Sequence, residues 1–374
     1  MMRRSLSTHL RSVALVLSLL GLILLGTESV GLNKACAQSS TAVFAGTGKA
    51  SKRREPYADS NQTIARNRIA LGNPFGIEIV GDQWWVTSVD DQCIYRGSLN
   101  GETLTRVAGN GLLGYGGDGE TADQATFNWP HEVRVDATGN LFVADTRNHV
   151  IRQIEGETNV VTTVAGNGTA GFAGDGQRGK QVQFRQPHSV VLDGRGGLLV
   201  ADTGNHRIRR IELETGIVTT ISGTGQKKLP KDRTDAAKAP LFGPRSLAVD
   251  NESIWIALRE GNSIWRIDRE TNLLHHVAGT GEKGYSGDGG DPRLATFKGP
   301  KGLVVDDRGR VLVVDTENHA IRRIDLESNR IETVLGGTRQ AETLTLKRPH
   351  GIAFHPEIGF LVGDSESHRV VVGR

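Results

Sequence analysis

The dipeptide Pro-His occurs three times in the 374-residue chain. Imidazole nitrogens bind zinc, exchange protons near neutral pH and donate hydrogen bonds to anions. Three further prolines at comparable spacing are followed by phenylalanine, arginine and lysine. Five of the six residues in this set can carry positive charge, and the set comprises Phe75, His131, His188, Arg245, Lys301 and His350. Whether they form one site depends on the elements that hold them.

These positions recur because the chain repeats one unit. The six prolines stand at residues 74, 130, 187, 244, 300 and 349. Each opens a series of short apolar runs, such as VVLD, LLVAD and RIRRI, which are separated by turns rich in Gly, Asn and Asp. Four short strands in roughly 50 residues are typical of a β-propeller blade, whose first strand lines the central channel. We therefore expect six blades, with the residues after the prolines converging at one channel mouth.

The last repeat needs a strand from the other end of the chain. After residue 349 there are only three runs, GIAF, FLVGD and RVVVG. The segment TAVFAGTG at residues 41–48 resembles the ends of other repeats, such as TTVAGNG. The sequence thus predicts one all-β domain over residues 41–374, a six-bladed β-propeller closed by residues 41–48, which removes an exposed sheet edge.

The first 37 residues read as a signal peptide. Basic residues precede an apolar run at residues 13–26, and Ala35-Cys36-Ala37 supplies a cleavage pattern. The run is shorter than the roughly 20 residues that span a bilayer, so we expect cleavage and no stable membrane span. Export to the periplasm or outside the cell follows, by the Sec route or, given Arg3-Arg4, the twin-arginine route. The sequence leaves open whether the segment stays as an anchor.

The charge balance argues against nucleic acid as a partner. The chain has a net charge of +3, and residues 1–37 account for it with four basic residues and one acidic residue. The mature protein is therefore close to neutral and lacks the basic stripe of a nucleic-acid binder. It retains only Cys93, so no intramolecular disulfide is possible. No P-loop or Gly-x-Ser-x-Gly motif is present.

Two further motifs recur, and both have a structural interpretation. Asp-Thr-x-Asn-His occurs at residues 145–149, 202–206 and 315–319, with a variant at 364–368. A motif present in most blades cannot be one active site, and Asp and Asn favour tight turns. Gly-Asp-Gly links place Asp118, Asp175 and Asp288 where calcium would be conceivable. Each link offers too few oxygen ligands, so we expect turn-capping aspartates.

The pattern Pro-x-Gly/Ser-Val-x-Val-Asp, followed by Leu-x-Val-Ala-Asp-Thr-x-Asn-His-x-Ile-Arg-x-Ile, resembles the NHL repeat of exported bacterial six-bladed propellers. Residues 130–184, 187–241 and 300–346 match best. The repeats at 74–127 and 244–297 depart from it at the Asp-Thr-x-Asn-His turn. Propellers of this family include enzymes, ligand sensors and interaction scaffolds, so the resemblance fixes the fold more closely than the function.

Two interpretations of the six-residue set compete. In one, Arg245 and Lys301 attract a carboxylate or phosphate and the histidines add donors. In the other, His131, His188 and His350 bind zinc. The second follows from a resemblance to the peptide-amidating lyase propellers, whose channel zinc is held by three histidines. However, blades two, three and six are not placed alternately around a ring, and the lyase's catalytic tyrosine and arginines have no match by motif.

We predict a scaffold that binds a peptide, protein or small anionic ligand through its loop face and a basic channel mouth, without a cofactor. The alternative is a metal-dependent enzyme with zinc or calcium in the channel, similar to the lyase or to gluconolactonase-like propellers. The acidic and amide set that binds the metal of the latter does not emerge at the channel positions. The ligand, the oligomeric state and the presence of an enzymatic activity stay open.

Overall fold

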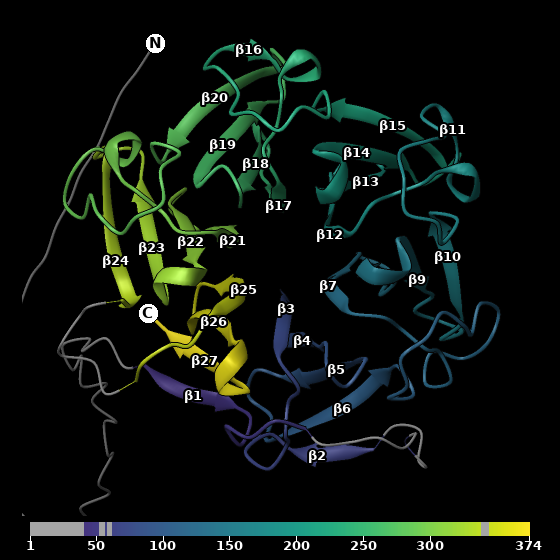
Figure 1. Cartoon of the computed structure of the whole chain (residues 1–374). Coiled ribbons are helices and arrows are strands. Elements are labelled where there is room, and N and C mark those ends of the chain that lie inside the picture. The colour runs from purple at the N-terminus through teal and green to yellow at the C-terminus, as the bar shows by residue number, and fades with distance from the viewer. Residues whose placement is uncertain (1–40, 52–56, 58–61, 338–343) are drawn as a thin grey trace, which may run out of the picture. The chain divides into compact units, whose positions relative to one another are not determined.

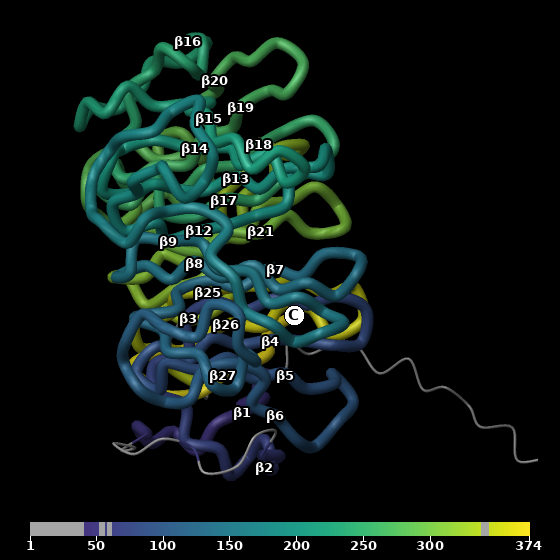
Figure 2. The backbone as a smooth tube through the Cα atoms, turned by 90° about the vertical axis from the view of Figure 1, so that its right-hand side faces the viewer, coloured from purple at the N-terminus to yellow at the C-terminus, as the bar shows by residue number. Residues whose placement is uncertain are grey.

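The computed structural model describes residues 41–51, 57, 62–337 and 344–374. Within these residues the strands form six antiparallel sheets, arranged as blades around a central axis (Figure 1). The edge-on view shows a disc with loops on both faces (Figure 2). The predicted all-β six-bladed β-propeller is confirmed. The predicted signal peptide, residues 1–37, lies outside the described residues.

The innermost strand of every blade begins at one of the six prolines. A proline at the first residue of a strand removes no ladder hydrogen bond, which suits this position. Neighbouring inner strands contact one another all the way round the axis. They are β3 (Pro74–Val80), β7 (Pro130–Val135), β12 (Pro187–Leu192), β17 (Pro244–Val249), β21 (Pro300–Val305) and β25 (Pro349–His355).

The other strands follow outward in chain order. Second strands are β4 (Gln83–Ser88), β8 (Leu141–Asp145), β13 (Gly197–Asp202), β18 (Ser253–Leu258), β22 (Val311–Asp315) and β26 (Gly359–Asp364). Third strands are β5 (Cys93–Ser98), β9 (Val150–Ile154), β14 (Arg207–Glu212), β19 (Ser263–Asp268), β23 (Ala320–Asp325) and β27 (Arg369–Gly373). Outer strands are β6 (Thr103–Ala108), β10 (Val161–Ala165), β15 (Ile217–Ser222), β20 (Leu273–Ala278), β24 (Arg330–Gly336) and β1 (Ala42–Ala45).

The remaining elements are short outer strands in three blades and single 3-10 turns. Two- or three-residue strands extend the outer edge of three blades: β2 (Thr63–Ala65), β11 (Gln177–Arg178) and β16 (Thr234–Asp235). Single 3-10 turns after the second strands are η1 (Thr146–Asn148), η3 (Thr203–Asn205), η6 (Thr316–Asn318) and η7 (Ser365–Ser367). Those in the links between blades are η2 (Gly179–Gln181), η4 (Ala236–Lys238) and η5 (Pro292–Leu294).

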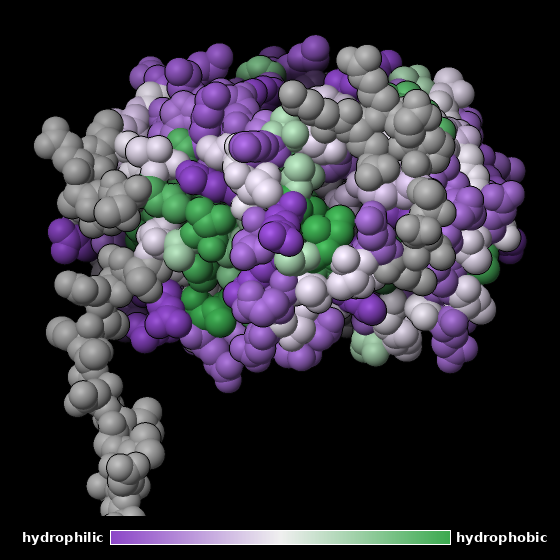
Figure 3. All heavy atoms as spheres, turned by 90° about the horizontal axis from the view of Figure 1, so that it is seen from below, coloured by the Kyte–Doolittle hydropathy of each residue, from purple (hydrophilic) through white to green (hydrophobic). Residues whose placement is uncertain are grey.

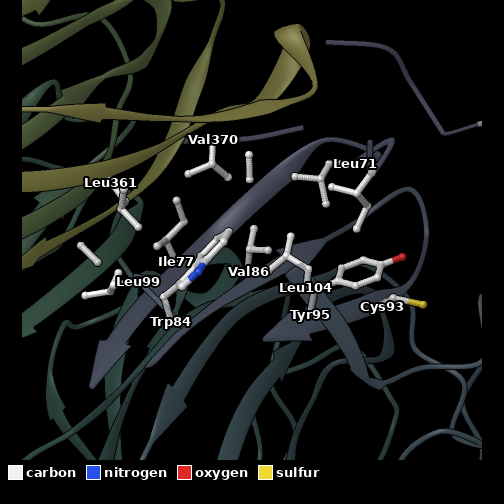
Figure 4. Packing of buried hydrophobic residues seen from close by; sticks show 13 residues of the cluster. Leu71, Ile77, Trp84, Val86, Cys93, Tyr95, Leu99, Leu104, Leu361 and Val370 are labelled. Atoms are coloured by element: carbon white, nitrogen blue, oxygen red, sulfur yellow. The ribbon is translucent and has the colours of Figure 1, made fainter. Parts of the chain in front are cut away.

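The ring closes between β1 and β27, as the sequence predicts. Val43 pairs with Val371, and Ala45 with Val370. Strand β1 is shorter than the predicted residues 41–48, because Gly46 adopts a φ of 98° that ends the extended conformation. Behind this closure, side chains from β26 and β27 pack against the first blade in one hydrophobic cluster (Figure 4).

The Asp-Thr-x-Asn-His motif forms the turn between the second and third strands. In the third blade Asp202 Oδ1 accepts a hydrogen bond from the backbone N–H of Arg185 (2.8 Å). Asn205 Nδ2 donates to Asp202 Oδ2 (2.8 Å), and Thr203 Oγ1 donates to the carbonyl of Pro244 in the next blade (2.6 Å). The polar side chains therefore join the turn to its own link and to the neighbouring blade.

The last residue of this turn makes a second connection between blades. His206 lies in the left-handed region (φ 55°), and its Nδ1 accepts a hydrogen bond from the backbone N–H of Gly243 (3.1 Å). In the two blades that depart from the motif, an amide oxygen replaces the imidazole and accepts the corresponding bond. Five of the acceptors are Gln92, His149, His206, Asn262 and His319. In the last blade His368 Nδ1 lies 3.4 Å from the backbone N of Asn73 and 3.2 Å from the carbonyl oxygen of Leu71. The structural interpretation of the motif is confirmed.

The aspartates of the Gly-Asp-Gly links pair with arginines of the third strands. The fully buried Arg209 has its Nη2 3.0 Å from Asp175 Oδ1 and its Nη1 3.6 Å from Asp202 Oδ2. The rings of Phe172 and Phe184 lie 5.0 and 5.6 Å from its guanidinium carbon. The equivalent pairs are Arg152–Asp118 and Arg322–Asp288. The aspartates that we considered as calcium ligands are thus ion-pair partners of core arginines.

One side of the ring is shown by hydropathy in Figure 3. The side that carries β1 and β2 shows hydrophilic residues over most of its area, with hydrophobic residues gathered in small patches (Figure 3). Cys93 is buried. In the described part of the chain, no helix has both the length and the apolar character needed to cross a membrane.

Candidate functional site

The residue after each opening proline lies in a β-bulge. The pairing of β12 with β13 shifts between Pro187 and Ser189, so His188 has no partner in the ladder. The register shifts directly after the opening proline in all six blades. A bulge re-aims the side chain of the unpaired residue. Here it turns six side chains toward the axis at one end of the channel.

These six side chains contact one another. Phe75 stacks on His350, with ring centroids 3.8 Å apart and an interplanar angle of 9°. His131 meets Phe75 edge-on at 4.8 Å and His188 at 4.9 Å. His188 is half-buried, and the other five are 5–7% exposed. The structure therefore brings together the whole set that the sequence grouped; we call Phe75, His131, His188, Arg245, Lys301 and His350 the channel ring.

Arg245 and Lys301 of the channel ring are hydrogen-bonded to two of its histidines. Arg245 Nη2 lies 2.6 Å from His131 Nε2, and Lys301 Nζ lies 2.8 Å from His350 Nε2. A guanidinium can only donate, so His131 accepts at Nε2 and carries its proton at Nδ1. His350 Nδ1 lies 3.0 Å from the carbonyl oxygen of Arg348, which places the proton of this ring at Nδ1 as well. Both histidines are thereby held neutral.

Burial concentrates the positive charge of the ring on one residue. Desolvation, with the charge of Arg245, holds the pKa of His131 well below its usual value. Desolvation, with the charge of Lys301, does the same for the pKa of His350. Burial, with the charge of Arg245, lowers the pKa of Lys301 to about 6. Burial also lowers the pKa of Arg245, but an arginine stays protonated at neutral pH. The basic ring expected from the sequence is therefore centred on Arg245.

The other guanidinium groups at this mouth have carboxylate partners. Arg348 Nη2 lies 2.8 Å from Glu317 Oε1, and its Nη1 lies 2.9 Å from Glu366 Oε1. Arg259 Nη1 lies 2.5 Å from Glu260 Oε1. These pairs neutralise the charges of Arg259 and Arg348 at the rim of the mouth.

A cavity of about 560 Å³ opens above the channel ring. Arg245 lies in its lining, and among the described residues the carboxylates of Glu260 and Glu132 act on this guanidinium only from beyond ion-pair distance. Its Nε is buried without a hydrogen-bond partner. Trp129 and Phe242 form part of the wall, and the exposed Lys227 stands at the edge. The cavity thus combines an unpaired buried cation with aromatic side chains.

The channel ring divides the channel into two compartments. Below it lies a void of only about 20 Å³, which has room for about one water molecule. Arg134 there forms ion pairs with Glu132 and with Glu78 (3.6 Å). Burial raises the pKa of Glu78 to about 7. The opposite mouth has a separate, mostly apolar cavity of about 270 Å³. A ligand that enters the cavity above the channel ring therefore stops at the ring.

Several residues of the mouth were missed by the sequence reasoning. Trp129 and Arg348 directly precede the prolines that open two inner strands, so their spacing could have identified them. Phe242 lies two residues before another of these prolines. Arg259 and Glu260 belong to the turn of the fourth blade that departs from the Asp-Thr-x-Asn-His pattern. That departure was a usable signal, because it occurs where the turn faces the cavity.

Two of the three histidines considered as zinc ligands bond to other side chains of the channel ring. The Nε2 atoms of His131 and His350 lie within hydrogen-bond distance of Arg245 and Lys301. Over residues 41–51, 57, 62–337 and 344–374, no group of three or more His, Cys, Asp or Glu side chains is placed to hold a metal ion. The metal alternative stays a prediction that needs a direct measurement.

Comparison with known proteins identifies the repeat. Residues 127–154, 184–211 and 297–324 match the family model described as NHL repeat. Protein SUPPRESSOR OF QUENCHING 1, chloroplastic, from Arabidopsis thaliana is 26% identical over 332 residues, which cover 83% of this chain and 31% of that protein. NHL repeat-containing protein 2 from Gallus gallus is 26% identical over 282 residues, which cover 65% of this chain and 38% of that protein. The chain thus spans well under half the length of these curated relatives.

A shorter match and a solved structure extend the comparison. Probable peptidyl-alpha-hydroxyglycine alpha-amidating lyase pgal-1 from Caenorhabditis elegans is 26% identical over 142 residues, which cover 37% of each chain. The crystal structure of an auxiliary nutrient binding protein from Bacteroides thetaiotaomicron superposes with a TM-score of 0.63 at 13% identity, covering 90% of this chain and 77% of that one. At this identity the structural match supports the fold alone.

Proposed function

Because the chain is an NHL-repeat protein folded as a six-bladed β-propeller, we propose that it is a binding scaffold for an anionic ligand. The ligand is a small molecule, or the anionic end of a peptide or protein, and it enters the cavity above the channel ring. One observation carries this proposal: the buried Arg245 at this cavity has no ion-pair partner among the described residues.

The physical argument concerns the free energy of burying a charge. Removing an ion from water costs several kcal/mol unless a counter-charge and hydrogen bonds compensate it. Among the described residues Arg245 hydrogen-bonds to a neutral imidazole, and Glu260 and Glu132 raise its pKa only from beyond ion-pair distance, so an anion in the cavity would recover part of that free energy. The half-buried His188 lines the same cavity and supplies a second polar group. Closed blades hold these side chains in place, which lowers the entropic cost of binding.

Export belongs to the same proposal. It rests on the basic, apolar and small-residue pattern of residues 1–37. The expected product starts after Ala37 and acts in the periplasm or outside the cell. N-terminal sequencing of protein recovered from the periplasm or the medium checks this, and an intact N-terminus in a cytoplasmic fraction would contradict it.

The anion site is tested with defined probes. The wild-type protein and the Arg245→Gln variant are heated with citrate, phosphate, and the tripeptide Gly-Gly-Phe with a free or an amidated C-terminus. We expect at least one anion to raise the unfolding midpoint of the wild type and to lose this effect in the variant. The peptide with an amidated C-terminus should raise the unfolding midpoint less than the peptide with a free C-terminus. The proposal fails if no anion acts, or if the variant responds like the wild type.

A channel metalloenzyme is the second candidate, favoured by the match to the lyase from C. elegans. Its ligands would be His131, His188 and His350, with zinc as the metal. The contacts of Arg245 and Lys301 with two of these imidazoles oppose it. Metal analysis of gently purified protein, with His188→Ala as the matched variant, decides between the two. Stoichiometric metal that disappears in the variant would favour the enzyme.

A further inference from the structure

We infer that the ligand of the mouth cavity is an aromatic monocarboxylate, whose carboxylate meets Arg245 while its ring lies against the aromatic wall. This inference rests on the proposed anion site and narrows its ligand class. It follows from three properties of the cavity: the number of unpaired positive charges, the composition of the wall, and the volume.

The cavity offers a single buried positive charge. Arg259 and Arg348 are paired with Glu260, Glu317 and Glu366. Lys301 Nζ lies 3.8 Å from Glu317 Oε1 and is hydrogen-bonded to His350. Lys227 is exposed at the edge, where solvent screens its charge. One guanidinium matches one carboxylate, whereas a phosphate dianion would bring a second negative charge close to the rim carboxylates.

The wall of the cavity is aromatic. Phe75, Trp129 and Phe242 line it together with imidazoles of the ring. The guanidinium carbon of Arg147 lies 3.5 Å from the centroid of the Trp129 ring, so it covers one face of the indole. Phe75 meets Trp129 edge-on at 5.9 Å. Aromatic pairs in edge-on or offset geometry are worth about 0.5–1.5 kcal/mol beyond the area that they bury.

The volume limits the size of the ligand. A cavity of about 560 Å³ is within the usual range for small-molecule sites and does not admit a folded domain. The channel ring closes its floor, so a ligand cannot thread through the propeller. A compact molecule with one ring and one carboxylate, or the C-terminal aromatic residue of a peptide, satisfies both limits.

Four probes separate the contributions of charge and ring: phenylacetate, its neutral amide, cyclohexylacetate and phenyl phosphate. Trp129 gives a local signal, because it is half-buried while the other four tryptophans are 1–7% exposed. We expect phenylacetate to change its fluorescence saturably and the amide to bind about 10- to 100-fold more weakly, since the bond to a charged group is lost. Cyclohexylacetate should bind about 2- to 10-fold more weakly than phenylacetate, because it lacks the aromatic ring. Phenyl phosphate should bind no more tightly than phenylacetate.

Variants tie these differences to residues, and calorimetry gives a readout independent of Trp129. Arg245→Gln should lower the affinity for phenylacetate about 10- to 100-fold. Arg210→Gln, which removes an arginine paired with Asp193 away from the cavity, should leave the affinity unchanged. Trp129→Leu should reduce the preference for phenylacetate over cyclohexylacetate. Unfolding midpoints measured in parallel show that each variant is folded.

The outcomes distinguish this inference from the proposed function. If phenyl phosphate binds more tightly than phenylacetate and Arg245→Gln abolishes both, the anion site stands and the inferred ligand class is wrong. The same holds if cyclohexylacetate binds as well as phenylacetate. If the neutral amide binds as tightly as the acid, or Arg245→Gln has no effect, both the inference and the anion site are overturned.

Discussion

The hydrogen bond between the last turn residue of one blade and the next link allows a sharp test of how the propeller is held together. His206 Nδ1 accepts the buried N–H of Gly243 at 3.1 Å. Asn262 makes the equivalent contact in the following blade, with φ 43° and its Oδ1 3.0 Å from the N–H of Gly299. The chain therefore contains its own matched control: His206→Asn should keep the bond, and His206→Ala should remove it.

The expected magnitude follows from the burial of this bond. His206→Ala leaves the N–H of Gly243 without an acceptor, which costs about 1–3 kcal/mol. Asparagine tolerates the left-handed conformation, so His206→Asn should cost less than about 1 kcal/mol. Urea denaturation measures both values. Hydrogen exchange at the Gly243 amide should accelerate in the alanine variant only. Equal stability of the two variants, or unchanged exchange, would refute the assignment of this contact.

Two further predictions concern ring closure and pH. Deletion of residues 41–48 leaves β27 as an open edge and uncovers Val370 and Val371, which are fully buried. We expect the free energy of unfolding to fall by at least about 3 kcal/mol. An unchanged unfolding midpoint would contradict the closure of the ring by β1. The pKa of Lys301 is about 6 in the folded protein and 10.5 ordinarily, so the unfolded chain binds more protons between these values and stability should rise with pH by up to about 1.4 kcal/mol per unit. Lys301→Met should flatten this slope in denaturation measured at pH 7, 8 and 9; an identical slope would show that Lys301 does not titrate as described.

The fold could be predicted because the same pattern of proline, apolar runs and turns occurs six times in the sequence. Pro187 and its equivalents open the inner strands at the positions that the repeat indicates. The need of the last blade for a fourth strand identified residues 41–48. The grouping of the six residues after the prolines was also accessible, because a propeller places equivalent positions at equal heights along one axis.

The chemistry of the site could not be read in the same way. Five of the six side chains can carry charge, which predicted a broadly basic mouth. Burial and mutual repulsion instead keep His131 and His350 neutral and lower the pKa of Lys301. The carboxylates that neutralise Arg259 and Arg348 come from turns of the same and neighbouring blades, and no pattern in the sequence joins them.

By itself the sequence determined the architecture: repeated runs of apolar residues must form radial sheets, and a closed ring must gather the residues after the prolines at one mouth. The tertiary structure decided the character of that mouth. Bulges at the strand starts turned the side chains inward, ion pairs at the rim cancelled most of the charge, and Trp129 and Phe242 supplied the wall. The reason is physical. Periodicity specifies local geometry, whereas charge and wall composition depend on desolvation and on contacts between residues far apart in the chain.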